Sequence, residues 1–168
     1  MFGSAFGFIS VAAAATVGVY RFGFDEGFAS ANGDLADIAA FVGLPLVGID
    51  FMIHRVDFTK GCGQWMQEHY FVVVLIMLEA FTRSMKKEAR ELAKTLTNIL
   101  FFVLPVGVGS YRNNDLHTLL AIIAFVLAAI VITPNRNKFL LGVRCENWFH
   151  YIIGFCAVLI AQGLPLKY

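Results

Sequence analysis

The chain has 168 residues, of which 58% are hydrophobic and only 15% are charged, and its mean hydropathy is +0.71. Soluble domains carry about a quarter charged residues, so this composition excludes an ordinary soluble domain and predicts an integral membrane protein. A net charge of +1 without zinc-finger spacing or a basic arm argues against nucleic-acid binding.

Six apolar segments predict an all-α integral membrane protein, a compact bundle of about six short transmembrane helices in a single domain over residues 1–168. Backbone groups in lipid must be satisfied internally, so we expect helices rather than strands. The first segment lacks a basic start, which predicts a retained helix instead of a signal peptide. A re-entrant hairpin is an alternative for the second and third segments. The segments are residues 2–20, 35–53, 64–82, 96–110, 116–133 and 149–164.

Small residues form a smooth face on the first and fifth segments, where another helix can approach closely. The first segment contains a G-x-x-x-G pattern that continues at helical spacing, and the fifth repeats it more weakly with alanines. The predicted helix-packing residues are Gly3, Gly7, Ala14, Gly18, Ala121, Ala124 and Ala128.

Three carboxylates, Asp50, Glu68 and Glu79, fall inside predicted segments. An ionisable group at bilayer depth costs about 2.5–3.5 kcal/mol, so each is a functional candidate. Asp50 lies near the end of its segment, where we expect it to reach water. Glu79 is expected to pair with Arg83 one turn later. Glu68 precedes Glu79 by about three helical turns, which predicts one acidic stripe facing protein or water.

Three histidines on the predicted membrane side of Asp50 are candidate metal ligands. His54, His69 and His117 with nearby carboxylates are candidate ligands for zinc, which would activate water to hydrolyse a lipid amide or ester. Their spacing matches no known zinc motif, so ordinary interfacial positions are favoured and no cofactor is predicted. The three cysteines are too far apart for a zinc knuckle and are predicted to be free thiols.

The turn "RSMKKEARELAKTLTN" carries five cations: Arg83, Lys86, Lys87, Arg90 and Lys94. The spacing of Leu92, Leu96 and Ile99 predicts that the helix starts before the membrane segment. Positive-inside topology explains the cations, and recognition of anionic lipid headgroups is the alternative.

Nine of the thirteen Lys and Arg residues follow the first, third and fifth segments. The positive-inside rule then makes that side cytoplasmic and places both termini in a lumen or outside the cell. The short spans favour the endoplasmic reticulum or another endomembrane.

The leading functional hypothesis is a non-catalytic subunit that packs against other integral membrane proteins and membrane lipids and stabilises or anchors a larger, lipid-handling complex. A small transporter or channel using the Glu68 stripe is the alternative, and a zinc-dependent lipid hydrolase is third. Pro45 and Pro105 are potential helix breakers of the kind found in transporters with inverted repeats. The stretches "VGVYR" (17–21) and "VGSYR" (108–112) are similar, but the similarity does not extend to later segments. We therefore attribute it to chance and not to an internal repeat.

Overall fold

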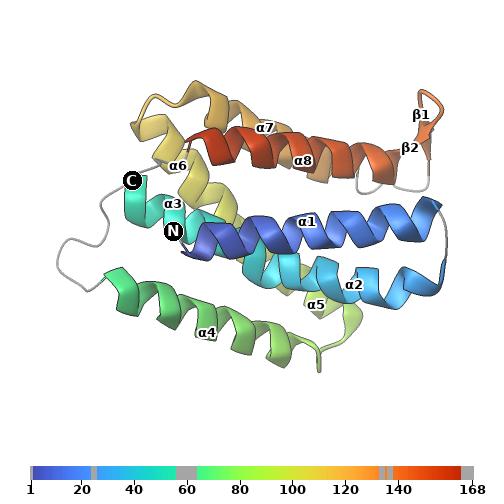
Figure 1. Ribbon diagram of the computed structural model, residues 1–168, viewed down its shortest axis with the longest axis horizontal. Coiled ribbons are helices and arrows are strands. Elements are labelled where there is room, and N and C mark those ends of the chain that lie inside the picture. The colour runs from blue at the N-terminus through green and yellow to red at the C-terminus, as the bar shows by residue number, and fades with distance from the viewer. Residues whose placement is uncertain (1, 24–25, 56–63, 133–134, 136–137, 164–168) are drawn as a thin grey trace. The chain divides into compact units, whose positions relative to one another are not determined.

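Helices make up nearly all of the described part of the chain in this computed structural model, which describes residues 2–23, 26–55, 64–132, 135 and 138–163 (Figure 1). The all-α prediction is confirmed. The helices are α1 (Phe2–Gly23), η1 (Glu26–Phe28), α2 (Ala29–Ile38), η2 (Ala39–Gly43), α3 (Leu44–Arg55), α4 (Gln64–Thr82), α5 (Lys87–Asn98), η3 (Ile99–Val103), α6 (Leu104–Arg112), α7 (Leu116–Val131) and α8 (Cys145–Gly163).

Helix occupies each of the six apolar segments. The bounds of α4 coincide with the predicted segment 64–82, whereas the helix containing segment 96–110 begins at Lys87, as the leucine spacing predicts. Within the described residues, Ser30–Ile53 and Lys87–Arg112 are long and apolar enough to cross a membrane. The shorter apolar helices are Gly3–Gly18, Tyr70–Thr82, Leu116–Val131 and Asn147–Gln162.

The chain divides into two compact units, Met1–Pro105 and Val106–Tyr168. In the first unit, the continuous helix α2–η2–α3 is the central element, and α1, α4, α5 and η3 all pack against it. Its apolar core joins η2 and α3 to Leu75 of α4. The buried members are Phe41, Val42, Leu46, Ile49, Ile53 and Leu75.

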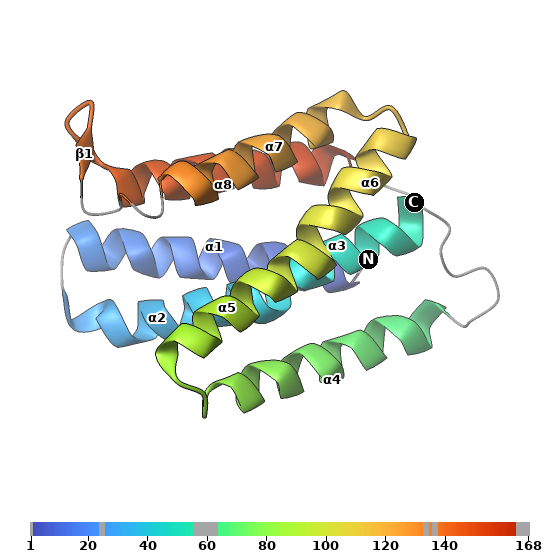
Figure 2. The same ribbon diagram turned by 180° about the vertical axis from the view of Figure 1, so that it is seen from behind.

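Helix α1 lies beside the central helix, and the two views in Figures 1 and 2 both show α1 next to α2. Glycines on α1 allow this close approach. A Cβ atom added to Gly7 would lie 2.5 Å from both the Gly43 carbonyl oxygen and a Val47 methyl group. Gly3 faces Asp50 and Gly18 faces Asn32 in the same way. Gly3, Gly7 and Gly18 therefore lie against the central helix of the same chain, and their predicted role in packing against other proteins stays a prediction.

The second unit contains the α7–α8 pair. Asp115 accepts a hydrogen bond from the Thr118 amide at 3.1 Å and so caps α7. The Cys156 thiol of α8 donates to the Ala121 carbonyl oxygen at 3.1 Å. Ala121 and Ala128 are buried and Ala124 is half-buried, so this predicted face also packs inside its own unit.

A short antiparallel hairpin precedes α8. Strands β1 (Phe139–Leu140) and β2 (Val143–Arg144) pair Phe139 with Arg144 and Leu140 with Val143. Leu141 and Gly142 between them both have positive φ angles, 53° and 77°, as a two-residue type I′ turn requires. The Trp148 indole donates to the Leu140 carbonyl oxygen at 2.9 Å, which ties the hairpin to the start of α8.

Replacing Gly7 with alanine is expected to lower the free energy of unfolding by about 1–3 kcal/mol, because the added methyl group overpacks the α1 contact. Gly33 is the matched control, since no described atom lies within 4 Å of its Cβ position. Gly33→Ala should be neutral or stabilising by up to about 1 kcal/mol through helix propensity. Thermal unfolding in detergent, followed by circular dichroism, compares the two variants. Equal midpoints would contradict the close packing of α1.

Candidate functional site

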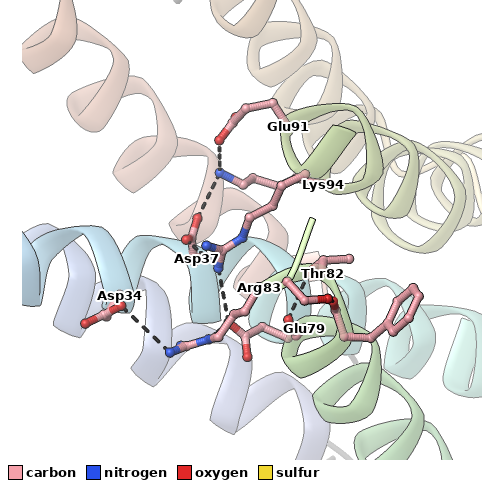
Figure 3. Close-up of polar contacts among 10 residues, drawn as sticks. Asp34, Asp37, Glu79, Thr82, Arg83, Glu91 and Lys94 are labelled. Atoms are coloured by element: carbon pink, nitrogen blue, oxygen red, sulfur yellow. Dashed lines mark hydrogen bonds and ion pairs between the residues drawn. The ribbon is translucent and has the colours of Figure 1, made fainter. Parts of the chain in front are cut away.

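Seven charged side chains form an alternating network of ion pairs at one end of the first unit (Figure 3). The network connects α2, the end of α4 and the start of α5. Acids and bases alternate along it, so each cation lies between two carboxylates. In order, its members are Asp34, Arg83, Glu79, Arg90, Asp37, Lys94 and Glu91.

Asp37 is at the centre of this network. One carboxylate oxygen lies 2.7 Å from Arg90 Nη2 and the other lies 2.8 Å from Lys94 Nζ. The three side chains are only 19–22% exposed, so their charges are poorly solvated and depend on one another. The Arg90 guanidinium also lies 6.0 Å from the ring centroid of Phe41, within cation–π range.

Glu79 is the buried acid of α4, with a side chain that is 10% exposed. Its Oε1 atom accepts hydrogen bonds from Arg83 Nε at 2.7 Å and from Arg90 Nη2 at 3.3 Å. The predicted Glu79–Arg83 pair is confirmed, and Arg90 adds a second partner from α5. The hydrogen bond and charge of Glu79 raise the pKa of Arg83 above its ordinary value, so Arg83 stays cationic throughout the accessible pH range.

Two charged residues of α5 face its own unit, whereas two of its leucines are exposed beside Lys87, Glu88 and Glu91. Arg90 and Lys94 face α2 and α4, whereas Leu92 and Leu96 are exposed. An amphipathic helix in water directs its apolar stripe toward the core. The stripe of α5 instead points away from the unit that contains it.

Asp50 forms a second polar contact at the opposite end of the central helix. It is only 1% exposed, and its Oδ2 atom accepts a hydrogen bond from the Ser4 amide at 2.6 Å. Ser4 lies in the first turn of α1, where amides lack partners within the helix. The expectation that Asp50 reaches water is wrong, because α1 packs over this end of α3 and the carboxylate caps α1 instead.

Of the other predicted site residues, three have side chains that the structure does not describe. Glu68 lies on α4 with Glu79, but its side chain and those of His54 and His69 lie outside the described residues. His117 is exposed near the start of α7. In the ranges that the structure describes, no three His, Cys, Asp or Glu side chains form a group that could hold a metal ion.

The five cations predicted to bind headgroups fall into two groups. Arg83, Arg90 and Lys94 are paired with acids of the chain itself. Lys86 and Lys87 are exposed at the α4–α5 turn and have no ion pair among the described residues. Headgroup recognition therefore stays a prediction for these two lysines.

Sequence reasoning missed Asp34 and Asp37 as partners of the cations in α5. Both aspartates lie at the start of the second segment, more than fifty residues before Arg90, and spacing along the chain carries no signal for so distant a pair. The available signal was the opposite charge of two regions: residues 21–37 hold four acids and one base, and residues 83–94 hold five bases and two acids. Buried charges require counter-charges, so these two regions were candidates to pair.

No protein family, curated protein or solved structure matches this chain.

Replacing Asp37 with asparagine is expected to lower the free energy of unfolding by about 1–3 kcal/mol, since two poorly solvated cations lose their shared carboxylate. Asp34 is the matched control: its side chain is 60% exposed and lies 4.0 Å from Arg83. Asp34→Asn should change stability by less than about 0.5 kcal/mol. Thermal unfolding at low ionic strength compares the variants, and equal losses would contradict the central position of Asp37.

Replacing Asp50 with alanine leaves the Ser4 amide buried without its acceptor and should cost about 1–3 kcal/mol. Asp50→Asn keeps an acceptor oxygen and should cost less. Hydrogen exchange of the Ser4 amide gives the local readout. Faster exchange in the alanine variant than in the asparagine variant is expected, and unchanged exchange in both would exclude Asp50 as the cap of α1.

Proposed function

We propose that this chain is a multi-pass integral membrane protein that acts as a non-catalytic subunit, packing against lipid and other transmembrane helices to stabilise or anchor a larger membrane complex. The observation that carries the proposal is the surface of α5, where Arg90 and Lys94 face the unit while Leu92 and Leu96 are exposed. In water the exposed leucines would gain nothing from the hydrophobic effect, because they stay in contact with solvent. In a bilayer the same side chains lie against lipid.

The outer face of α4 supports a lipid-facing surface. Val73, Met77 and Phe81 are 55–66% exposed and recur at helical spacing, with Leu75 and Glu79 on the buried face. Large exposed apolar patches on soluble proteins mark sites that something else covers. Helices α7 and α8, which both belong to the second unit, show the same kind of surface, with Leu120, Leu127, Ile130, Phe155 and Val158 exposed.

The position of the ion-pair network fits the proposed sidedness. The network joins the second half of α2 to the end of α4 and to α5, and these segments flank the two turns that we assign to the cation-rich side. This is the side assigned to the cytoplasm by the positive-inside rule. We propose that both termini lie on the lumenal or outer side, in the endoplasmic reticulum or another endomembrane.

The proposed subunit role rests on two features of the chain: its short described connections and its exposed apolar helix faces. Its described connections, such as the one from Arg83 to Lys86, are short and contain no extramembrane domain. The glycine face of α1 is occupied within the chain, so partners would meet the apolar faces of α4, α5, α7 and α8. These faces are rich in branched and aromatic side chains, which can pack on helices or lipid.

A small transporter is a second candidate because two long helices are interrupted. Ala39–Gly43 and Ile99–Val103 are π-helical turns, each followed by a Leu-Pro pair. Interrupted helices form substrate sites in many transporters. Loss of flux in Glu68→Gln with normal expression would support this alternative, and unchanged flux would remove Glu68 from it.

Replacing Val73 with lysine tests the membrane surface. At the centre of a lipid-facing span a lysine costs about 2.5–3.5 kcal/mol, whereas on a water-exposed helix it costs less than about 0.5 kcal/mol. We therefore expect less protein to resist alkaline extraction from membranes. Glu88→Lys, at an exposed position in the first turn of α5, is the control and should insert normally. Normal insertion of both variants would contradict a lipid-facing α4.

Purification from the native membrane in mild detergent tests the subunit role. Stoichiometric integral membrane partners that are lost when the apolar face of α5 is altered by Leu92→Gln and Leu96→Gln would support it. A chain that purifies alone, or only with copies of itself, would contradict it.

A further inference from the structure

The connection between α7 and α8 contains a β-hairpin whose exposed side chains are apolar. Phe139, Leu140 and Leu141 are 66%, 51% and 84% exposed, and they follow one another along β1 and into the turn. A run of large apolar side chains is unusual on a surface that faces water. The turns 83–86 and 113–115 of the same chain consist mainly of polar residues.

The turn of this hairpin places a leucine in a backbone conformation that leucine rarely adopts. Leu141 has a φ angle of 53°, in the left-handed region, where the Cβ atom crowds the following carbonyl oxygen. Asn114, in the turn before α7, has the same φ angle of 53°, and asparagine tolerates this conformation. A type I′ turn ordinarily carries Asn-Gly, so the hairpin has leucine where turn chemistry favours asparagine.

Nothing in the described structure offsets the strain at Leu141. Because this residue is 84% exposed, its side chain gains little from packing within its own unit. A strained backbone position that carries an exposed apolar side chain indicates a contact with something outside the unit.

Hydrogen bonds hold the hairpin to the start of α8. The Cys145 amide donates to the Lys138 carbonyl oxygen at 2.8 Å, and the Trp148 indole donates to the Leu140 carbonyl oxygen at 2.9 Å. An isolated two-stranded hairpin is only marginally stable in water, so these contacts determine where its tip lies. Figures 1 and 2 both show the hairpin standing to the side of the α8 axis, at the end where α8 begins.

The residues around the tip match the interface between a bilayer and water. Trp148 and Tyr151 meet edge to face with ring centroids 6.2 Å apart, and these two residue types gather at the level of lipid headgroups. Lys138 at the base of the hairpin is exposed and has no ion pair among the described residues. Residues 133–144 contain three bases and no acid, which complements the negative charge of lipid phosphates.

We propose that the β1–β2 hairpin is an interfacial membrane anchor, in which Leu140 and Leu141 enter the boundary between headgroups and acyl chains and Lys138 binds a lipid phosphate. The inference rests on the proposed membrane location, where the hairpin joins the ends of two spans at the membrane surface. It adds a lipid-binding site that lies in the plane of the interface. Burial of the Leu141 side chain in lipid then compensates for its backbone strain.

Spin labels on the full chain in nanodiscs of phosphatidylcholine and phosphatidylserine test the anchor. The native cysteines are replaced by alanine, and Leu140→Cys, Ser84→Cys and Val73→Cys each carry one label. Oxygen concentrates among acyl chains and a nickel chelate stays in water, so the ratio of their collision rates with the label reports immersion. The ratio at position 140 is expected to be at least about fivefold higher than at the exposed turn position Ser84.

Leu141→Asn removes the apolar tip and also relieves the strain of the turn, so the hairpin should stay folded. With the label at position 140, this variant should lower the ratio at least about twofold. Leu141→Met is the matched control, because it keeps an apolar side chain, and should leave the ratio unchanged. Slow hydrogen exchange of the residue 145 amide in both variants shows that the base of the hairpin is intact.

The label at Val73 separates failure of the anchor from failure of the membrane location. A water-exposed label at position 140 with a lipid-exposed label at Val73 would overturn the anchor alone. Water exposure at both positions would contradict the membrane location as well. A label at position 140 that neither reagent reaches would show that protein covers the hairpin, and this too would overturn the anchor.

Discussion

The first unit depends on a buried helix that carries a carboxylate near each end. Asp37 holds Arg90 and Lys94 of α5, and Arg90 in turn reaches Glu79 of α4. Asp50, more than three turns away, holds the first turn of α1. Helices α1, α4 and α5 thus each have a polar contact that connects them to the central helix, directly or through Arg90. Apolar packing along Phe41, Leu46 and Leu75 fills the space between these two levels.

In apolar surroundings, close packing and polar contacts are the interactions that still stabilise helix association. Helices in lipid gain little from burying leucine, since lipid tails are equally apolar. Leu92 and Leu96 are exposed, whereas Gly7, Ser10 and the paired charges of Arg90 and Asp37 lie inside the unit, and this arrangement fits the proposed membrane location. The Arg90 Nε atom is buried and has no hydrogen-bond partner among the described residues, so the network is not fully satisfied.

The sequence predicted local features well and distant ones poorly. The bounds of α4, the Glu79–Arg83 pair and the early start of α5 all follow from spacing within one helix. The sequence predicts that Asp50 reaches water because it lies near the end of its segment. Its position along the helix does not determine its exposure, since α1 packs over the side of α3 that carries it. Arg90 and Lys94 were assigned to lipid headgroups for a related reason: nothing in the spacing links them to Asp37. The prolines indicated interruptions, and a π-helical turn precedes each of them.

The contact between Asp50 and the Ser4 amide also constrains the order of events during synthesis. Its two partners are forty-six residues apart, so α1 emerges from the ribosome long before its acceptor exists. Until Asp50 has been synthesised, the first turn of α1 needs a substitute acceptor such as water. We therefore expect α1 and α3 to mature together as one helical hairpin, with the start of α1 protected from exchange only after residue 50 has been added.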